Sequence, residues 1–217
     1  MTGARVTTIA VGGQPLTLLP EKAAFLPASR TLLVADAHIG KAVTFRALGV
    51  PVPRGTTSFD RTASVSLVVP RAHAASTLGA VARWRRAHAS LSLVLVRGNH
   101  DDRAGDPPSH LGIEVVDEPH AQDGFALCHH PRPQRGSYVL AGHLHPCVGI
   151  GGRGFDHLRL PCFWLGDDVG VLPAFGAFTG MHPIQAAPND RVFAVADDTI
   201  ASLQPRAPMP VTERRAA

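Results

Sequence analysis

The chain contains little cysteine and no long apolar run. Its three cysteines, among 217 residues, form no Cys-x-x-Cys pair, whereas the disulfide scaffolds of secreted proteins carry dense, even-numbered cysteines. No apolar run approaches the ~20 residues that a membrane helix needs. The first ten residues are too short and too polar for a secretory signal. These absences exclude a disulfide scaffold and a membrane-spanning helix, and they predict a cytoplasmic protein.

Composition predicts one globular domain with a tail. Hydrophobic residues make up 45% of the chain and charged residues 18%, a balance that can bury a sizeable core in a chain of this length. We expect the domain to span residues 1–203 and the proline-containing segment 204–217 to be a disordered tail. The net charge of +4 favours a polyanionic partner. A generally basic composition without such a partner stays open as the alternative.

Polar clusters follow several short apolar runs. Asp36 and His38 follow the run 32–35, a Gly-Asn-His-Asp sequence at 98–101 follows the run 91–96, and Gly-His-x-His at 142–145 follows the run 138–141. A histidine pair at 129–130 forms a further cluster. Short apolar runs that stop at such residues are typical of buried strands. We therefore expect the clusters to meet at one edge of a sheet.

The residue types in these clusters suit a divalent metal. Carboxylate, imidazole and amide ligands together favour manganese, iron or zinc. In an extended chain, side chains two residues apart point to the same side, so we expect His143 and His145 to share a direction, as Asp36 and His38 would. Six of the 12 histidines are expected to be structural or at the surface, namely His73, His88, His110, His120, His157 and His182. One member of the 129–130 pair suffices as a ligand, which leaves His130 ambiguous.

Periodicity and turn residues predict several further elements. Gly12 and Gly13 mark the turn of an opening hairpin, and the pair at 197–198 marks the turn of a closing one. A helix is expected over 74–87, with its arginines at 83, 85 and 86 facing solvent. Helical character over 40–48 ends at a glycine. Cys128 is expected to be a small buried hydrophobe rather than a ligand.

In their order along the chain, the four polar clusters resemble those of the calcineurin-like metallophosphoesterase superfamily. The chain is similar in particular to the bacterial ligase-associated DNA-damage-response endonucleases of that superfamily. The segments that carry this narrower resemblance are 34–41, 48–53, 96–101, 127–131, 140–146, 160–164 and 172–180.

The resemblance implies an α/β fold, a two-sheet sandwich flanked by helices, and a centre of two divalent ions, with manganese favoured. It implies that Asp36, His38 and His145 bind one ion and that Asn99, His129 and His143 bind the other. His100 would assist the leaving group, with Asp101 available to orient it. Lys41 and Arg97 are candidate contacts to the substrate phosphate. The implied activity is phosphodiester hydrolysis in DNA repair, beside a DNA ligase, a helicase and an exonuclease.

The chain departs from the family pattern at one point. The family has a bridging aspartate in a Gly-Asp motif after the second strand, but no Gly-Asp lies between Asp36 and Asn99, so part of the second β-α unit is missing. Either Asp60 is the bridge, or the apolar run 66–70 is a remnant of the strand with no acid after it. Two other functions stay open: a phosphatase or nucleotide phosphodiesterase for small molecules, and a degenerate, weakly active interaction protein.

Overall fold

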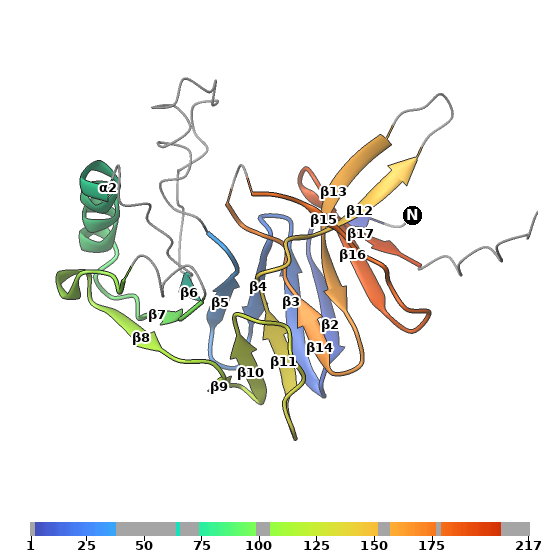
Figure 1. The fold of residues 1–217 in the computed structure, drawn as a ribbon, viewed down its shortest axis with the longest axis horizontal. Helices are drawn as coiled ribbons and strands as arrows, with labels where there is room; N and C mark the ends of the chain where they lie inside the picture. The colour runs from blue at the N-terminus through green and yellow to red at the C-terminus, as the bar shows by residue number, and fades with distance from the viewer. Residues whose placement is uncertain are drawn as a thin grey trace, which may run out of the picture.

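The computed structural model describes residues 3–37, 64–65, 74–98, 105–151, 157–176 and 179–204. Within these ranges the chain is rich in strands, which form two large sheets and a separate pair (Figure 1). No helix among the described residues is long and apolar enough to cross a membrane.

The first sheet contains five strands in chain order. Its first four strands are antiparallel, and the last one, β6, runs parallel to β5. The strands are β2 (Thr7–Val11), β3 (Gln14–Leu19), β4 (Ala23–Leu26), β5 (Thr31–Val34) and β6 (Ser64–Val65). A parallel pair, β7 (Leu93–Val96) and β8 (Ile113–Val116), follows, with β7 in contact with β6.

The second sheet contains ten strands and is mixed. Its order is β1-β17-β16-β13-β14-β11-β10-β9, and β12 pairs with both β13 and β15. Strands β10, β11 and β14 are parallel neighbours. The bounds are β1 (Gly3–Ala4), β9 (His120–Gln122), β10 (Phe125–Cys128), β11 (Tyr138–Ala141), β12 (Pro146–Gly151), β13 (His157–Leu165), β14 (Val169–Val171), β15 (His182–Pro183), β16 (Arg191–Ala196) and β17 (Thr199–Leu203).

One apolar core lies between the two sheets. Leu33 of β5 packs in the same cluster as Leu127 of β10 and Leu140 of β11, and Phe163 of β13 is completely buried there. Because side chains alternate along a strand, the neighbouring residues of these strands point to the other face of their sheet, away from this core. Cys128, for example, is buried in a separate small cluster. This shared core is compatible with the predicted two-sheet sandwich.

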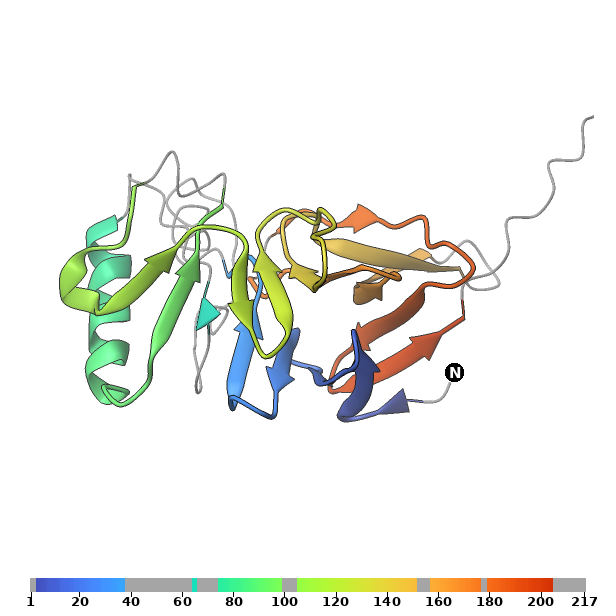
Figure 2. The ribbon, with the colours of Figure 1, turned by 90° about the horizontal axis from the view of Figure 1, so that it is seen from below.

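Helix α2 (Ala74–Ala87) lies beside the β7–β8 pair and shares an apolar cluster with residues of the first sheet. Val81 packs in a cluster with Val34 and with Leu111 of the 3-10 helix Ser109–Leu111. Figure 2 shows α2 beside β7 and β8, at the end of the molecule opposite β16 and β17. The bounds match the prediction, but Arg85 does not face solvent as expected. It is half-buried because it donates hydrogen bonds to the carbonyl oxygens of Leu111 (3.0 Å) and His88 (2.7 Å).

The predicted hairpins are confirmed. β2 and β3 pair around Gly12 and Gly13, and β16 and β17 pair around Asp197, which adopts a φ of 49°. Helices flanking both sheets were expected, whereas α2 is the single α-helix of the described residues. The helix expected over 40–48 and the tail from 205 onward lie outside the described residues.

Among the described residues, the strand of the second β-α unit is the short β6. β6 consists of Ser64 and Val65, which pair with Leu33 and Val34 of β5 in parallel register. Since β6 runs parallel to β5, its carboxyl end lies toward the sheet edge at which β5 ends. The residue after this end is Ser66, which is not acidic. Asp60 precedes β6 in the sequence and lies outside the described residues.

Candidate metal centre

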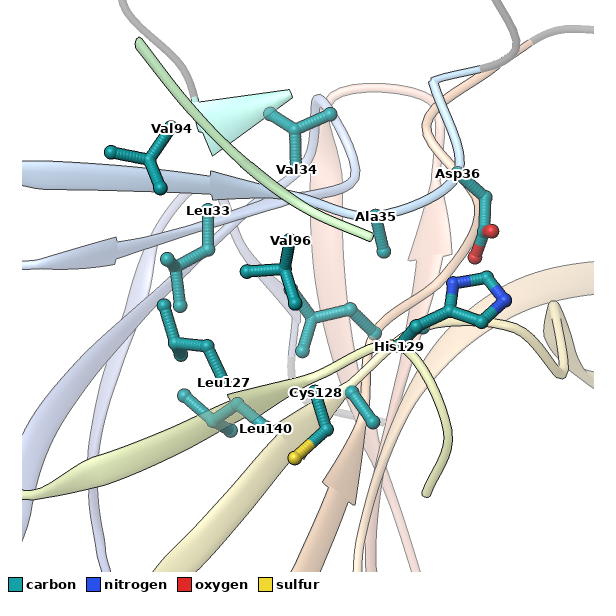
Figure 3. Close-up of a pocket in the computed structure, with 13 residues that line it drawn as sticks. Leu33, Val34, Ala35, Asp36, Val94, Val96, Leu127, Cys128, His129 and Leu140 are labelled. Carbon is teal, nitrogen blue, oxygen red and sulfur yellow. The ribbon is translucent and has the colours of Figure 1, made fainter. Parts of the chain in front are cut away.

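The carboxyl ends of β5, β7, β10 and β11 surround one pocket. It has a volume of about 70 Å³ and is lined mainly by aliphatic side chains. Figure 3 shows the Asp36 carboxylate and the His129 imidazole together at one end of this pocket, while the Cys128 sulfur points away from the imidazole. The fold thus places a carboxylate from one sheet against a histidine from the other. All three cysteines are unpaired and buried, and burial raises the pKa of the Cys128 thiol to about 11.

Asp36 is a buried carboxylate held by two histidines. Its side chain is 2% exposed. Its Oδ2 accepts a hydrogen bond from the backbone N–H of His143 at 2.7 Å and lies 3.7 Å from Nε2 of His145. Burial raises the pKa of this carboxyl, but the interactions with His145, the His143 N–H and His129 outweigh it, so the net pKa is lowered. The site therefore holds a buried negative charge.

His129 and His143 face each other through their ring nitrogens. Nε2 of His129 lies 2.9 Å from Nδ1 of His143, and the ring centroids are 4.7 Å apart. Burial lowers the pKa of His129 to about 4, so its ring is neutral at pH 7, which is the form that binds metals. Two nitrogens bound side by side on one ion at ~2.1 Å lie about 3 Å apart. The spacing of this pair therefore fits a shared ion that replaces the proton between them.

His145 is oriented by a backbone carbonyl. Its Nδ1 lies 3.0 Å from the oxygen of Gly180, and because a carbonyl oxygen can only accept, Nδ1 carries the proton. In the neutral ring, Nε2 then carries the lone pair, on the side that faces Asp36. Metal-binding histidines commonly donate their other ring N–H in this way. The donor set of Asp36, His129, His143 and His145 is therefore suited to a divalent cation.

The backbone at three of these candidate ligands is not extended. Asp36, His143 and His145 have φ values of 48°, 71° and 52°, the left-handed region that non-glycine residues rarely adopt. The two-residue period of a strand therefore does not apply to His143 and His145, and the expected shared direction rested on the wrong backbone geometry. The two rings instead have different partners, His129 and Asp36 respectively. Such strain is typical of functional sites.

Two glycines allow the elements to approach closely. A Cβ on Gly142 would lie 2.6 Å from Oδ2 of Asp36. A Cβ on Gly98, which follows β7, would lie 2.6 Å from Cγ and 2.7 Å from Cε1 of His129. Distances below 3 Å require one of the groups to move. The strand ends can therefore approach each other only with glycine at these positions.

We expect Gly98→Ala to displace the His129 ring. The affinity for metal and any metal-dependent activity should then fall by at least tenfold, the smallest loss usually seen when a group that positions a metal-binding side chain is disturbed. Isothermal titration with Mn²⁺ and an activity assay measure the change. Gly149→Ala is the matched control, because Gly149 is exposed and has nothing within 4 Å of its added Cβ. Wild-type Mn²⁺ affinity in Gly98→Ala would contradict the packing described here.

Glu118 and His130 belong to this site, although the sequence gave no sign of Glu118 and left His130 ambiguous. Oε2 of Glu118 accepts the backbone N–H groups of His129 (2.7 Å) and His130 (2.9 Å). Its Oε1 lies 2.8 Å from Nδ1 of His130. Burial raises the pKa of Glu118, but the hydrogen bonds from His130 and His129 outweigh it and the net pKa is lowered. Glu118 lies 11 residues before His129 and 12 before His130, so no local sequence pattern could predict that they are in contact.

Arg97, a predicted phosphate contact, is paired with acids at the surface. Its guanidinium donates to Asp106 at 3.0 and 2.7 Å and to Asp117 at 2.7 Å. These interactions raise its pKa further. Three of its five donors therefore face carboxylates, and a phosphate would have to compete with them or use the remaining ones.

The structure brings Asp36, His129, His143 and His145 together, as described above. The other residues predicted for the site lie outside the described residues: His38, Lys41, Asp60, Asn99, His100 and Asp101.

The fold is a β-sandwich. At the ends of its strands, the site gathers an aspartate and three histidines that could hold a metal ion. No family model matches the chain, and no curated protein sequence matches it. It is similar to a solved structure, the crystal structure of Pseudomonas putida nuclease MPE, with 40% sequence identity and a TM-score of 0.74 over 91% of this chain and 100% of the other. At this identity and coverage, the chain belongs to the same family as that nuclease.

Proposed function

We propose that this protein is a metal-dependent phosphoesterase of the calcineurin-like superfamily that hydrolyses phosphodiester bonds in DNA, as an endonuclease. The observation that carries the proposal is the meeting of Asp36, His129, His143 and His145 at strand ends from two sheets. The family relationship to a protein named as a nuclease supports it.

In this proposal the centre holds two divalent ions, with manganese favoured over iron or zinc. Asp36, His38 and His145 bind one, and Asn99, His129 and His143 bind the other. The distances between these residues support this division, since Asp36 lies beside His145 and His129 lies beside His143. When bound, the ions stabilise the charge that develops on the phosphate oxygens and activate water.

The remaining residues bind substrate and transfer a proton. His100 donates a proton to the departing alkoxide oxygen, and Asp101 orients it. Lys41 and Arg97 bind phosphate oxygens, with Arg97 exchanging one of its acidic partners for the substrate. We propose that the enzyme acts in the cytoplasm in DNA repair, beside a DNA ligase, a helicase and an exonuclease; the net charge of +4 supports a DNA partner.

We expect purified protein supplied with Mn²⁺ to cleave DNA, to lose this activity in a chelator, and to bind DNA less tightly as the salt concentration rises. Gel assays on single- and double-stranded DNA, beside hydrolysis of a small nitrophenyl diester, provide the measurement. Hydrolysis of the small ester alone, with no DNA cleavage, would instead indicate a small-molecule phosphoesterase. Metal-free protein with no turnover of either substrate would indicate an interaction protein.

Elemental analysis tests whether the missing Gly-Asp motif weakens the binding of metal ions at the centre. Without a bridging carboxylate, repulsion between two nearby cations is less compensated, so we expect the second of the two ions to bind weakly and about one ion per chain to be tightly bound. Under this interpretation Asp60→Asn is nearly silent. Two tightly held ions, lost together with activity in Asp60→Asn, would instead identify Asp60 as the bridge.

A further inference from the structure

We propose that His130 is a third imidazole ligand of the metal centre and that Glu118 is its positioning residue. The inference rests on the proposed metal centre and adds a residue that the ligand division above leaves out. The rings of His129, His130 and His143 form one group. Potential ligand atoms of His129, His130 and His143 lie within 4.8 Å of one another, and the ring centroid of His130 is 4.8 Å from that of His129 and 4.7 Å from that of His143.

Glu118 determines which ring nitrogen of His130 is available. The Glu118 carboxylate is ionised and can only accept hydrogen bonds, so the Nδ1 of His130, 2.8 Å from Oε1, must carry a proton. In the neutral ring, Nε2 is then the unprotonated nitrogen. This is the tautomer that a metal ligand needs, held by a carboxylate in the way that many metal-binding histidines are held.

Glu118 also fixes the backbone of the turn. Its second oxygen accepts the N–H groups of His129 and His130. One carboxylate therefore orients the chain as it leaves β10 and the His130 ring together. The nitrogens of two ligands on opposite sides of an ion at ~2.1 Å are about 4.2 Å apart. The present spread of potential ligand atoms is at most 4.8 Å, so the three imidazoles already lie near the spacing that a shared ion needs.

Glu118→Gln tests the proposal with little change in volume. The amide oxygen can still accept the backbone N–H groups, but the amide nitrogen presents a donor to Nδ1. His130 then favours the tautomer with a proton on Nε2, which blocks that nitrogen as a ligand. We expect the affinity for Mn²⁺ alone, measured by isothermal titration, to fall about 10–100-fold. Nitrogen NMR of the neutral His130 ring in the metal-free protein should show the tautomer with the proton on Nδ1 in the wild type and the tautomer with the proton on Nε2 in the variant.

A double variant separates the two actions of Glu118. If Glu118 acts through the His130 ring, Glu118→Gln adds no further loss of Mn²⁺ affinity to His130→Ala. Additive losses would show that Glu118 acts independently of the His130 ring, and they would overturn its role toward His130. Glu114→Gln is the matched control, because Glu114 is an exposed residue of β8.

Two further outcomes would overturn the ligand assignment. One is wild-type Mn²⁺ affinity in Glu118→Gln. The other is a His130→Ala variant with unchanged Mn²⁺ affinity and a raised KM, which would assign His130 to the substrate. The tests are separate from that of the proposed function, because titration and NMR need no turnover. Mn²⁺ binding without DNA cleavage would overturn the function alone.

Discussion

His143→Ala is expected to lower Mn²⁺-dependent DNA cleavage by more than about 100-fold, because removing a ligand costs more than removing a group that supports one. The imidazole of His143 lies 2.9 Å from that of His129, and its ring also contacts His130. Alanine keeps the backbone N–H that binds Asp36, so the carboxylate stays held. The substitution therefore removes the ring while preserving this link between the two sheets.

Initial rates of DNA cleavage and Mn²⁺ titration measure the effect, and thermal unfolding checks that the fold persists. His110→Ala is a suitable control, since His110 lies exposed in the 3-10 helix. Undiminished cleavage by His143→Ala would remove this residue from the metal centre.

His100→Ala is expected to reduce turnover about 10²–10⁴-fold, the usual contribution of a general acid, while sparing the bound metal. His100 follows Gly98 by two residues, and Gly98 packs directly against the His129 ring. The loss should be smaller for a nitrophenyl ester, because its leaving group departs without a proton. Cleavage rates on DNA and on that ester, together with the metal content of the variant, test whether His100 acts as a general acid. Loss of metal from His100→Ala would make His100 a ligand instead.

Local patterns in the sequence predicted most of the elements near the site. The helix over 74–87 and the two hairpins follow from apolar periodicity and from turn residues, which act over a few neighbouring positions. The strands before Asp36 and His143 were likewise visible as short apolar runs. Arg85 was placed wrongly because its acceptor, the carbonyl of Leu111, lies in a segment far along the chain.

The second β-α unit shows where sequence reasoning was incomplete. The absence of a Gly-Asp motif was visible in the sequence, but it remained open whether Asp60 is the bridge or the run 66–70 is a remnant of the strand with no acid after it. The structure places β6 at Ser64 and Val65, just before the run 66–70 that was one alternative. Only the pairing with Leu33 and Val34 of β5 identifies this strand, since two residues are too few for any periodicity.

By itself, the sequence predicted the candidate ligands and, for those in the described residues, their positions near strand ends, since residue type and apolar runs are local properties. The tertiary structure decided the partners. Asp36 meets the N–H of His143 across 107 positions, at left-handed backbone angles that an extended-chain argument could not supply. The tertiary structure also brought Glu118 into contact with His129 and His130, although Glu118 precedes β9 and the pair follows β10. Such contacts depend on how two sheets pack, and packing is a property of the whole core.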